Sequence, residues 1–560
     1  MDMSQKTIKH MFLQREYMYI PTYQRRYTWK RENVIRLLDD IERVIENLDD
    51  REYTHYIGTV YIQEKQRGVW ELIDGQQRVT TITLLVQAII NNISDRDSEM
   101  RKDKEHWRSE FLEDRDTGEN KIELSYDDEI EMEQLRDGID KTGTSEIKVN
   151  YRIIEKWLNE NYIGKEKDIR DIVRALDRLR IIEVALSGKD NAQEVFDGIN
   201  ATGQPLTLGD QVKNYLLMPY TKEEQEDMYM NYWRPVELEF GTANNFQKYL
   251  KMYITIRNEA QTHSDVGTNA YERFKHYKER FGLDNKEFLE ELKDNFDIYK
   301  KIENNRFEDR KTKEIMRRLS YVLFKDTDAL GYLIQIVKMK EDLEITENEF
   351  KETLEVLEGY ILRRILNDGY TQTHSYYNYL NKIVRKRMEY SGESYSSSLR
   401  SALNSDIEKR TPSDNEIRIR VKNVVIYRSG GRNARYLLER IENGDSKEQM
   451  DVYSDKSKYT VEHIMPQQLS EEWKRKLGES QVEQASIYEH TLGNLTLTGY
   501  NSEYSNRTFE EKMEDVNGYR DSRFTNLNNS VVNKTVWDIN TIKNRTEELA
   551  QRIMDMYPYE

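Results

Sequence analysis

The fold of the N-terminal region is decided by residues 55–93, which read HYIGTVYIQEKQRGVWELIDGQQRVTTITLLVQAIINNI. Residues 55–63 and 69–73 are rich in β-branched and aromatic side chains, and a polar turn with Gly68 separates them, which predicts a hairpin. Residues 80–93 (TTITLLVQAIINNI) predict a buried helix. The segment DGQQRVT (residues 74–80) therefore lies at a strand-to-helix junction, so the first hundred residues predict mixed α and β structure.

The rest of the chain is mainly helical in pattern. Amphipathic spacing predicts a helix over residues 32–48, and helical periodicity dominates from about 151 to 400. Residues 95–150 are highly charged and predict a solvated, partly irregular insertion. Strand-like runs return at 458–464 and 492–498 and precede a helix-like 508–513. We predict a multidomain, predominantly helical α+β chain divided at about 1–220, 221–395 and 396–560, with the last boundary in the polar stretch 388–416.

Composition excludes several classes of protein. The 560 residues carry 86 basic and 103 acidic side chains, a formal net charge of −17, and 37% hydrophobic residues, too many for a disordered chain. Because there is no cysteine, disulfides, thiolate zinc sites, iron–sulfur clusters and cysteine nucleophiles are excluded, and any metal needs oxygen or imidazole ligands. No apolar run reaches the roughly 18 residues of a membrane span, and the start lacks a signal-peptide core, so we expect a cytoplasmic protein without membrane contact.

Two N-terminal segments carry groups suited to a nucleotide. IPTYQRRYTW (residues 20–29) clusters forked donors and aromatic faces, which phosphates and bases require, although a polar loop before a helix reads the same way. In DGQQRVT, Asp74 suits a metal or a ribose hydroxyl, and Arg78 suits a phosphate near the helix N-terminus. A capped turn with an Arg–Asp pair is the structural alternative. Walker A, GxGxxG, GxSxG and HExxH motifs do not occur.

The C-terminal region carries an ordered set of polar residues. YTVEHIMPQ (459–467) is strand-like and contains His463, and LGNLTLTGYN (492–501) and SNRTFEEK (505–512) follow. A strand, a turn, a second strand and a helix, with histidine on the first strand, is what a ββα-metal nuclease requires. A neutral imidazole takes the proton from an attacking water, and carboxylate and amide oxygens hold a hard divalent cation. A packed, non-catalytic histidine is the alternative for His463 alone.

Together these segments resemble a known family. IPTYQRRYTW, DGQQRVTT and FDGINATGQPL (196–206) resemble the ParB-like N-terminal domain of GmrSD-type, modification-dependent (type IV) restriction endonucleases. VEHIMPQ, LGNLTLTGYN and NRTFEEK resemble their C-terminal HNH, or His-Me finger, nuclease domain, and YILRR (360–364) resembles a helix between the two. The resemblance implies a ParB-like α/β domain, a helical coupling region and a ββα-metal domain, in that order.

The resemblance also implies site residues. The N-terminal domain would bind and hydrolyse a nucleoside triphosphate (GTP, UTP, CTP or ATP), with a pocket formed by Tyr23, Gln24, Arg25, Asp74, Gly75, Gln76, Gln77, Arg78 and Asn200, and with Gly203 behind Asn200. In the nuclease domain His463 would be the general base and Glu462 a ligand of Mg²⁺ or Mn²⁺. Asn494 would tie the loop together, and Asn501 would complete the metal site, in competition with Asn506. Glu462 stands where aspartate is common, which puts the metal preference in question.

The resulting hypothesis is a defence endonuclease that cleaves modified, double-stranded foreign DNA under nucleotide control. Basic residues available to grip DNA cluster at 363–364, 385–387 and 418–422 and at Arg432 and Arg435, although each cluster also suits a solvated helix face. The tyrosine-rich run 373–379 suits stacking on an unpaired base, or ordinary packing. Phosphorothioated DNA or RNA as target, a nucleotide-sensing DNA-binding regulator with an inactive nuclease domain, and a purely structural N-terminal pocket are the alternatives. A homo-oligomer is left open.

Overall fold

The computed structural model describes residues 1–94, 98–138, 141–187, 190–200, 206–257, 270–323, 327–370, 375–405, 409–428, 430–444, 446, 448–453 and 458–559. The chain forms two compact units. Unit 1 contains Met1–Gln247 and Gly282–Glu290, and unit 2 contains Lys248–Phe281 and Glu291–Glu560. The three-part division stays a prediction; by compactness, the region 221–395 belongs partly to each unit.

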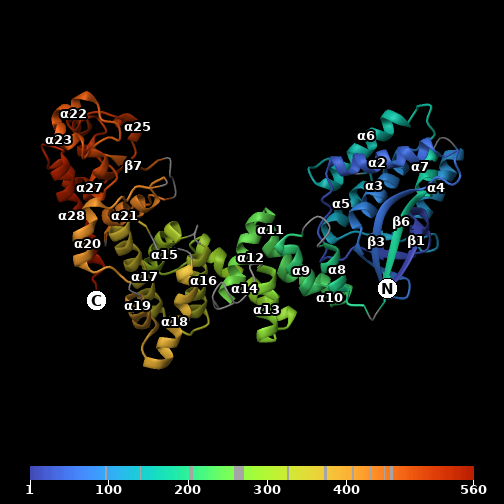
Figure 1. The fold of residues 1–560 in the computed structure, drawn as a ribbon, viewed down its shortest axis with the longest axis horizontal. Helices are drawn as coiled ribbons and strands as arrows, with labels where there is room; N and C mark the ends of the chain where they lie inside the picture. The colour runs from blue at the N-terminus through green and yellow to red at the C-terminus, as the bar shows by residue number, and fades with distance from the viewer. Residues whose placement is uncertain are drawn as a thin grey trace. The chain divides into compact units, whose positions relative to one another are not determined.

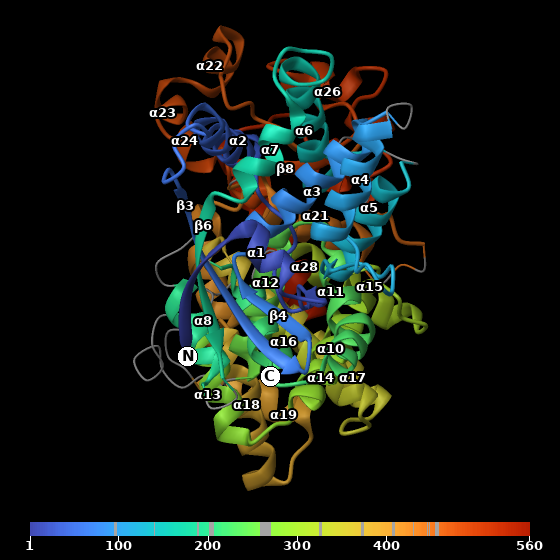
Figure 2. The same ribbon diagram turned by 90° about the vertical axis from the view of Figure 1, so that its right-hand side faces the viewer.

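Unit 1 is built on a six-stranded mixed sheet with the order β1-β6-β3-β4-β2-β5. Three of these strands, β3, β4 and β6, are labelled in Figure 2. The predicted hairpin is confirmed, because β3 and β4 pair antiparallel and Gly68 joins them at a φ of +79°. The strand β6, far along the chain, pairs parallel with β3 and antiparallel with β1. The strands are β1 (Asp2–Thr7), β2 (Tyr17–Tyr19), β3 (His55–Gln66), β4 (Val69–Asp74), β5 (Ile122–Glu123) and β6 (Leu179–Leu186).

Helix α3 is the centre of the unit 1 core. Nearly all of its side chains are buried, because sheet residues lie on one side and other helices on the other (Figure 1). The predicted amphipathic helix at 32–48 is α2. The helices are α1 (Ile8–Leu13), α2 (Arg31–Glu46), α3 (Gln76–Asn92), α4 (Ser98–Phe111), α5 (Tyr126–Arg136), α6 (Glu146–Asn161), α7 (Ile169–Leu176), α8 (Ala192–Asn200), α9 (Leu208–Leu217), α10 (Lys222–Met228), the π-helix η1 (Tyr229–Trp233), α11 (Arg234–Glu239) and the start of α12 (Ala243–Arg257).

The charged region 95–150 differs from its prediction. Where it is described, it forms α4, β5, α5 and the start of α6 instead of an irregular insertion. Most of its few aliphatic and aromatic residues, among them Trp107, Phe111, Met132 and Leu135, are buried in the unit 1 core. High charge hides this pattern in the sequence, because the helices expose their charged faces and bury only narrow apolar stripes.

In the described part of unit 2, the secondary structure is helical apart from one two-stranded sheet, in which β7 (Thr460–His463) pairs antiparallel with β8 (Leu495–Thr498). The polar stretch 388–416 lies within unit 2 and includes α19. The helices are the ends of α12 and α14 (Asn285–Glu303), α13 (Ala270–Phe281), α15 (Arg310–Leu323), α16 (Thr327–Glu341), α17 (Glu347–Asp368), α18 (Ser375–Ser391), α19 (Tyr395–Ser405), α20 (Asp414–Arg420), η2 (Val421–Asn423), α21 (Arg432–Asn443), α22 (Glu471–Leu477), α23 (Glu479–Val482), α24 (Ala485–Tyr488), η3 (Leu492–Asn494), α25 (Asn501–Tyr504), α26 (Phe509–Glu514), η4 (Tyr519–Asp521), α27 (Thr525–Val532) and α28 (Ile539–Met556).

Helix α26 follows the sheet along the chain and begins at a capping box. The Thr508 side chain accepts from the backbone of Glu511, and the Glu511 side chain accepts in return from the backbone of Thr508. The fully buried Arg545 of α28 donates to the carbonyls of Gly493 and Leu495 at 2.7 and 2.8 Å. The Arg545 contacts hold the β7–β8 sheet against helix α28. Over the described part of the chain, no helix has the length and apolar character needed to span a bilayer.

Candidate functional site

His463 ends strand β7 and lies in a hydrogen-bonded chain with two other residues. Its Nε2 is 3.0 Å from Nδ1 of His490, and Nε2 of His490 is 3.0 Å from a carboxylate oxygen of Glu489. Because an ionised carboxylate only accepts, it places the His490 proton on Nε2, so Nδ1 of His490 accepts from His463. The proton of neutral His463 is therefore on Nε2, and its Nδ1 carries the lone pair.

The surroundings keep the His463 ring uncharged. Burial lowers the pKa of His463 to about 3, and the nearby His490 and Lys512 add to this effect. The Tyr427 ring meets the His463 ring edge-on at 4.7 Å and stacks on His490 at 5.6 Å. With 8% of its surface exposed, His463 is held in one orientation as a neutral proton acceptor.

Glu462 points to the opposite side of β7 and binds a buried lysine. Its Oε1 accepts from Nζ of Lys512 at 2.6 Å and from the Tyr519 hydroxyl at 3.5 Å. Burial raises the pKa of the Glu462 carboxyl, and the Lys512 ammonium opposes part of that rise. Because an ammonium already neutralises this carboxylate, Glu462 does not fit the expected role of metal ligand in this arrangement. Within the described residues, no group of three His, Asp or Glu side chains is placed to hold a metal.

Asn494 and Asn501 both bind backbone groups. The fully buried Asn494 donates from Nδ2 to the carbonyls of Met465 and Glu489, both at 2.9 Å, and its Oδ1 accepts from the Met465 N–H at 2.8 Å. This is the loop-tying geometry that the resemblance implies. Asn501, at the start of α25, donates to the Val461 carbonyl at 3.1 Å. Asn506 is exposed. Asn501 is thus the one of the two asparagines that reaches β7.

The strand-to-helix junction in unit 1 brings together Asp74, Arg78 and Arg25. Gly75, at a φ of +96°, allows β4 to turn into α3 directly after Asp74. Burial raises the pKa of the Asp74 carboxyl, and the Gly75 N–H, Arg78 and Arg25 oppose the rise. Arg78 donates to the Thr59 carbonyl at 3.2 Å, and burial lowers the pKa of its guanidinium. The junction combines a carboxylate and guanidinium groups at the N-terminus of a helix.

The glutamines of the same motif join it to the loop 20–29. Gln24 donates to the Ile73 carbonyl at 2.7 Å, and Gln76 donates to Oε1 of Gln24 at 3.2 Å. Oε1 of Gln77 accepts from the Thr28 N–H at 2.8 Å. All three glutamines thus help to hold the two segments together.

The remaining expected N-terminal residues are placed differently. The side chain of Tyr23 is fully buried, and burial together with nearby Glu71 raises the pKa of its hydroxyl. A register irregularity between β3 and β4 at Leu72–Asp74 pairs Glu71 with Gln63 and Asp74 with Tyr61. The side chain of Asn200 and the whole of Gly203 lie outside the described residues.

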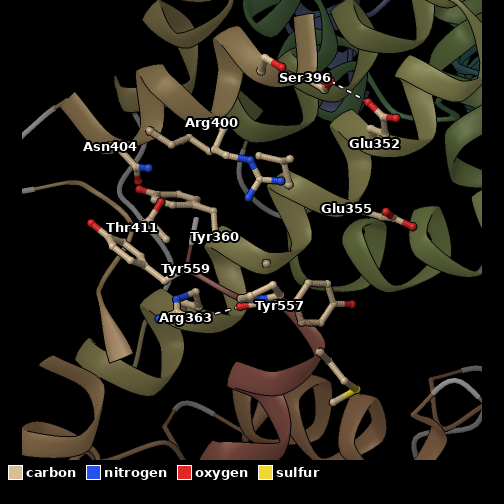
Figure 3. Close-up of a pocket in the computed structure, with 16 residues that line it drawn as sticks. Glu352, Glu355, Tyr360, Arg363, Ser396, Arg400, Asn404, Thr411, Tyr557 and Tyr559 are labelled. Carbon is tan, nitrogen blue, oxygen red and sulfur yellow. Dashed lines mark hydrogen bonds between the residues drawn. The ribbon is translucent and has the colours of Figure 1, made fainter. Parts of the chain in front are cut away.

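The YILRR helix lines a cavity of about 260 Å³ in unit 2 (Figure 3). Arg363 is buried and donates to the carbonyls of Pro412 and Tyr557 at 2.8 and 2.9 Å, and it also pairs with Asp414. Arg364 is buried against Asp368 at 2.7 Å. Both arginines therefore have structural partners, which favours a structural role, and the prediction that they contact DNA stays a prediction.

Two other expected contacts of the middle region are also buried. Arg435 is 8% exposed, and Tyr376 and Tyr377 are 6% and 0% exposed, which supports packing over base stacking. The rest of the run 373–379 lies outside the described residues or side chains. The basic residues of 385–387 and 418–422 are exposed or half-buried, and the half-buried Arg432 lies over the Tyr321 ring. These residues stay candidates for contact with DNA.

Sequence reasoning missed the partners of His463. His490 lies 27 residues along the chain and Lys512 lies 49 residues along it, and no local pattern links either to His463. The one available signal is position, because His490 directly precedes the TLGN segment and Lys512 ends the NRTFEEK segment. Both flank motifs that the resemblance had already singled out.

Comparisons with known proteins agree with this placement. The model of the GmrSD restriction endonuclease N-terminal domain matches residues 8–217, which include the DGQQR junction. The model of the C-terminal domain of GmrSD restriction endonucleases matches residues 411–552, which include β7, β8 and α26. A search of curated proteins found no match. The two domain models occur in one chain, in order, and each covers one of the two candidate sites.

Proposed function

Because this chain belongs to the GmrSD restriction endonuclease family, we propose that it is a defence endonuclease that cleaves modified foreign DNA. Family membership supports a nuclease that acts on DNA in a defence role. The single observation that carries the proposal to this chain is the Glu489–His490–His463 chain, which lies within the matched C-terminal domain. The choice of modified phage DNA as substrate rests on the family resemblance.

In the proposed reaction, Nδ1 of His463 takes a proton from the water whose oxygen bonds to phosphorus. The P–O bond to the departing sugar oxygen breaks, and that oxygen takes a proton from solvent. His490 keeps the correct tautomer of His463 available, and the Glu489 carboxylate balances the charge that develops on the paired imidazoles. A low pKa makes the free imidazole a weak base, but a bound phosphate beside the ring raises its proton affinity. The Gln467 amide nitrogen lies 3.4 Å from Nδ1 and 3.3 Å from Nε2 of the same ring, so Gln467 lies directly beside the proposed base.

The proposed metal requirement is a separate question. Mg²⁺ or Mn²⁺ would supply charge stabilisation at the scissile phosphate, and both prefer oxygen ligands. The amide oxygen of Asn501 is of the right kind, whereas Glu462 holds Lys512. We therefore assign the proton transfer to His463 and leave Glu462 out of the reaction.

We also propose that the unit 1 junction binds a nucleoside triphosphate that controls cleavage. The support is the combination of Asp74, Arg78 and Arg25 at the N-terminus of α3, where backbone N–H groups and guanidinium groups attract phosphate. Control of this kind requires the nucleotide to favour one arrangement of the chain over another. GTP, UTP, CTP and ATP are all candidates.

The test is a cleavage panel with unmodified, hydroxymethylated, glucosylated and phosphorothioated phage DNA, with and without each nucleotide and with Mg²⁺ or EDTA. His463→Ala should abolish cleavage, and His276→Ala, an exposed residue of α13, should leave it intact. Cleavage of one modified DNA that only His463→Ala removes would establish the nuclease and its target class. Cleavage that persists in His463→Ala would exclude the proposed base, and hydrolysis of nucleotide without any DNA cleavage would favour the regulator or RNA alternatives.

A further inference from the structure

Lys512 fills a small cage of oxygen atoms at the end of β7. Its ammonium lies 2.6 Å from Oε1 of Glu462, 3.1 Å from the His463 carbonyl oxygen and 3.2 Å from the Ile464 carbonyl oxygen. The three protons of an ammonium match these three acceptors. The Lys512 side chain is 0% exposed and that of Glu462 is 5% exposed, so the pair lies away from bulk solvent.

The cage has the composition of a cation site. One carboxylate oxygen and two backbone carbonyl oxygens are the ligands that hard cations take in proteins. The cage lies directly beside the candidate base, because one of its oxygens is the His463 carbonyl itself. A buried carboxylate with no positive partner is unfavourable, so some cation must accompany Glu462 in the folded protein.

We propose that Lys512 is the resident cation of this site, and that Glu462 serves as its counter-ion and does not bind a catalytic metal. The ammonium takes the position beside Glu462 in which the family resemblance places a divalent ion. Through the same contacts it ties α26 to the His463 end of β7. This inference concerns cation binding and stability, so it stands or falls separately from the proposed reaction.

Truncation of the lysine should open a cation site. In Lys512→Ala the cage keeps its three oxygens and gains an unpaired carboxylate beside a cavity, so a small cation from solution should enter. Lys512→Met removes the charge but fills most of the volume, which makes it the matched control. Glu462→Gln removes the negative charge and leaves the ammonium buried without a counter-ion.

The test combines thermal unfolding with Mn²⁺ titration of the full chain. Each single variant should lower Tm by about 10 °C, because it leaves a buried charge or its hydrogen-bond partners without a partner. The double variant Glu462→Gln/Lys512→Met should lower Tm by less than the sum of the two single decreases. Ammonium chloride should raise the Tm of Lys512→Ala relative to tetramethylammonium chloride at equal ionic strength, and should not do so for Lys512→Met.

Mn²⁺ binding decides the role of Glu462. We expect Glu462→Gln to change the Mn²⁺ affinity of the otherwise unaltered chain by less than twofold, and Lys512→Ala to bind Mn²⁺ at least tenfold more tightly than the parent. A tenfold or greater loss of Mn²⁺ affinity in Glu462→Gln would overturn the inference. So would a Lys512→Ala protein whose Tm and Mn²⁺ affinity both equal those of the parent.

Discussion

Replacement of Asn494 by alanine tests whether this residue acts by holding the β7–β8 loop together. Its side chain is 0% exposed and makes four hydrogen bonds, to Met465 N and O, to the Glu489 carbonyl and to the Trp537 indole N–H at 3.2 Å. At about 1 kcal/mol for each bond, Asn494→Ala should cost about 4 kcal/mol. The cost falls on the local structure, because both Met465 groups and the Glu489 carbonyl are left without this partner.

Hydrogen–deuterium exchange of the β7 and β8 amides measures this loss where it occurs. A loss of about 4 kcal/mol corresponds to roughly a thousandfold faster exchange, since each 1.4 kcal/mol is tenfold. Asn506→Ala, an exposed residue of the same region, should change the exchange by less than about threefold. If Asn494→Ala exchanges like the parent but cleaves DNA more slowly, Asn494 acts on the substrate, and the structural reasoning is refuted.

Three further substitutions test other parts of the structure. The pKa of His463 is about 3 in the folded protein and about 6.5 in the unfolded chain. Its contribution to the free energy of unfolding is therefore complete above pH 6.5 and is lost, at roughly 1.4 kcal/mol per pH unit, as the pH falls toward 3. Between pH 7 and 5, urea unfolding should show that His463→Gln loses about 2 kcal/mol less stability than the parent. Gly58→Ala should lower the free energy of unfolding by about 2 kcal/mol, because Gly58 has a φ of +123°. It should also weaken nucleotide binding measured by calorimetry, because a Cβ there would lie 2.5 Å from the Arg78 guanidinium. Arg545→Met should lower the stability of unit 2 by about 3 kcal/mol, followed by circular dichroism, because it strips donors from buried carbonyls.

Matched controls separate these effects from general damage. Arg51→Ala changes an exposed residue between α2 and β3 and should leave nucleotide binding and stability unchanged. Arg475→Met removes an arginine whose side chain is 78% exposed and should cost less than about 0.5 kcal/mol. If His463→Gln and the parent lose the same stability between pH 7 and 5, the argument from the His463 pKa is contradicted. If Arg545→Met and Arg475→Met lower the free energy of unfolding equally, the argument from the buried Arg545 hydrogen bonds is contradicted.

Local patterns determined a large part of this molecule. The β3–β4 hairpin, the amphipathic α2 and the buried α3 follow from residue spacing along the chain, as do β7, β8 and α26. The order of the motifs along the chain located the two candidate sites, because each set of motifs lies largely on elements that are close together in the sequence. Absence of cysteine limited any metal site to oxygen and imidazole ligands.

Tertiary contacts decided what sequence patterns leave open. β6 joins the sheet beside β3 across more than a hundred residues, a pairing that no local spacing specifies. Charge in residues 95–150 concealed core helices, because a narrow apolar stripe is enough to bury a helix once a partner surface exists. Whether a polar residue acts on a substrate or stabilises the fold depends on which groups surround it in the folded chain. Only the tertiary structure places Lys512 against Glu462 and His490 against His463.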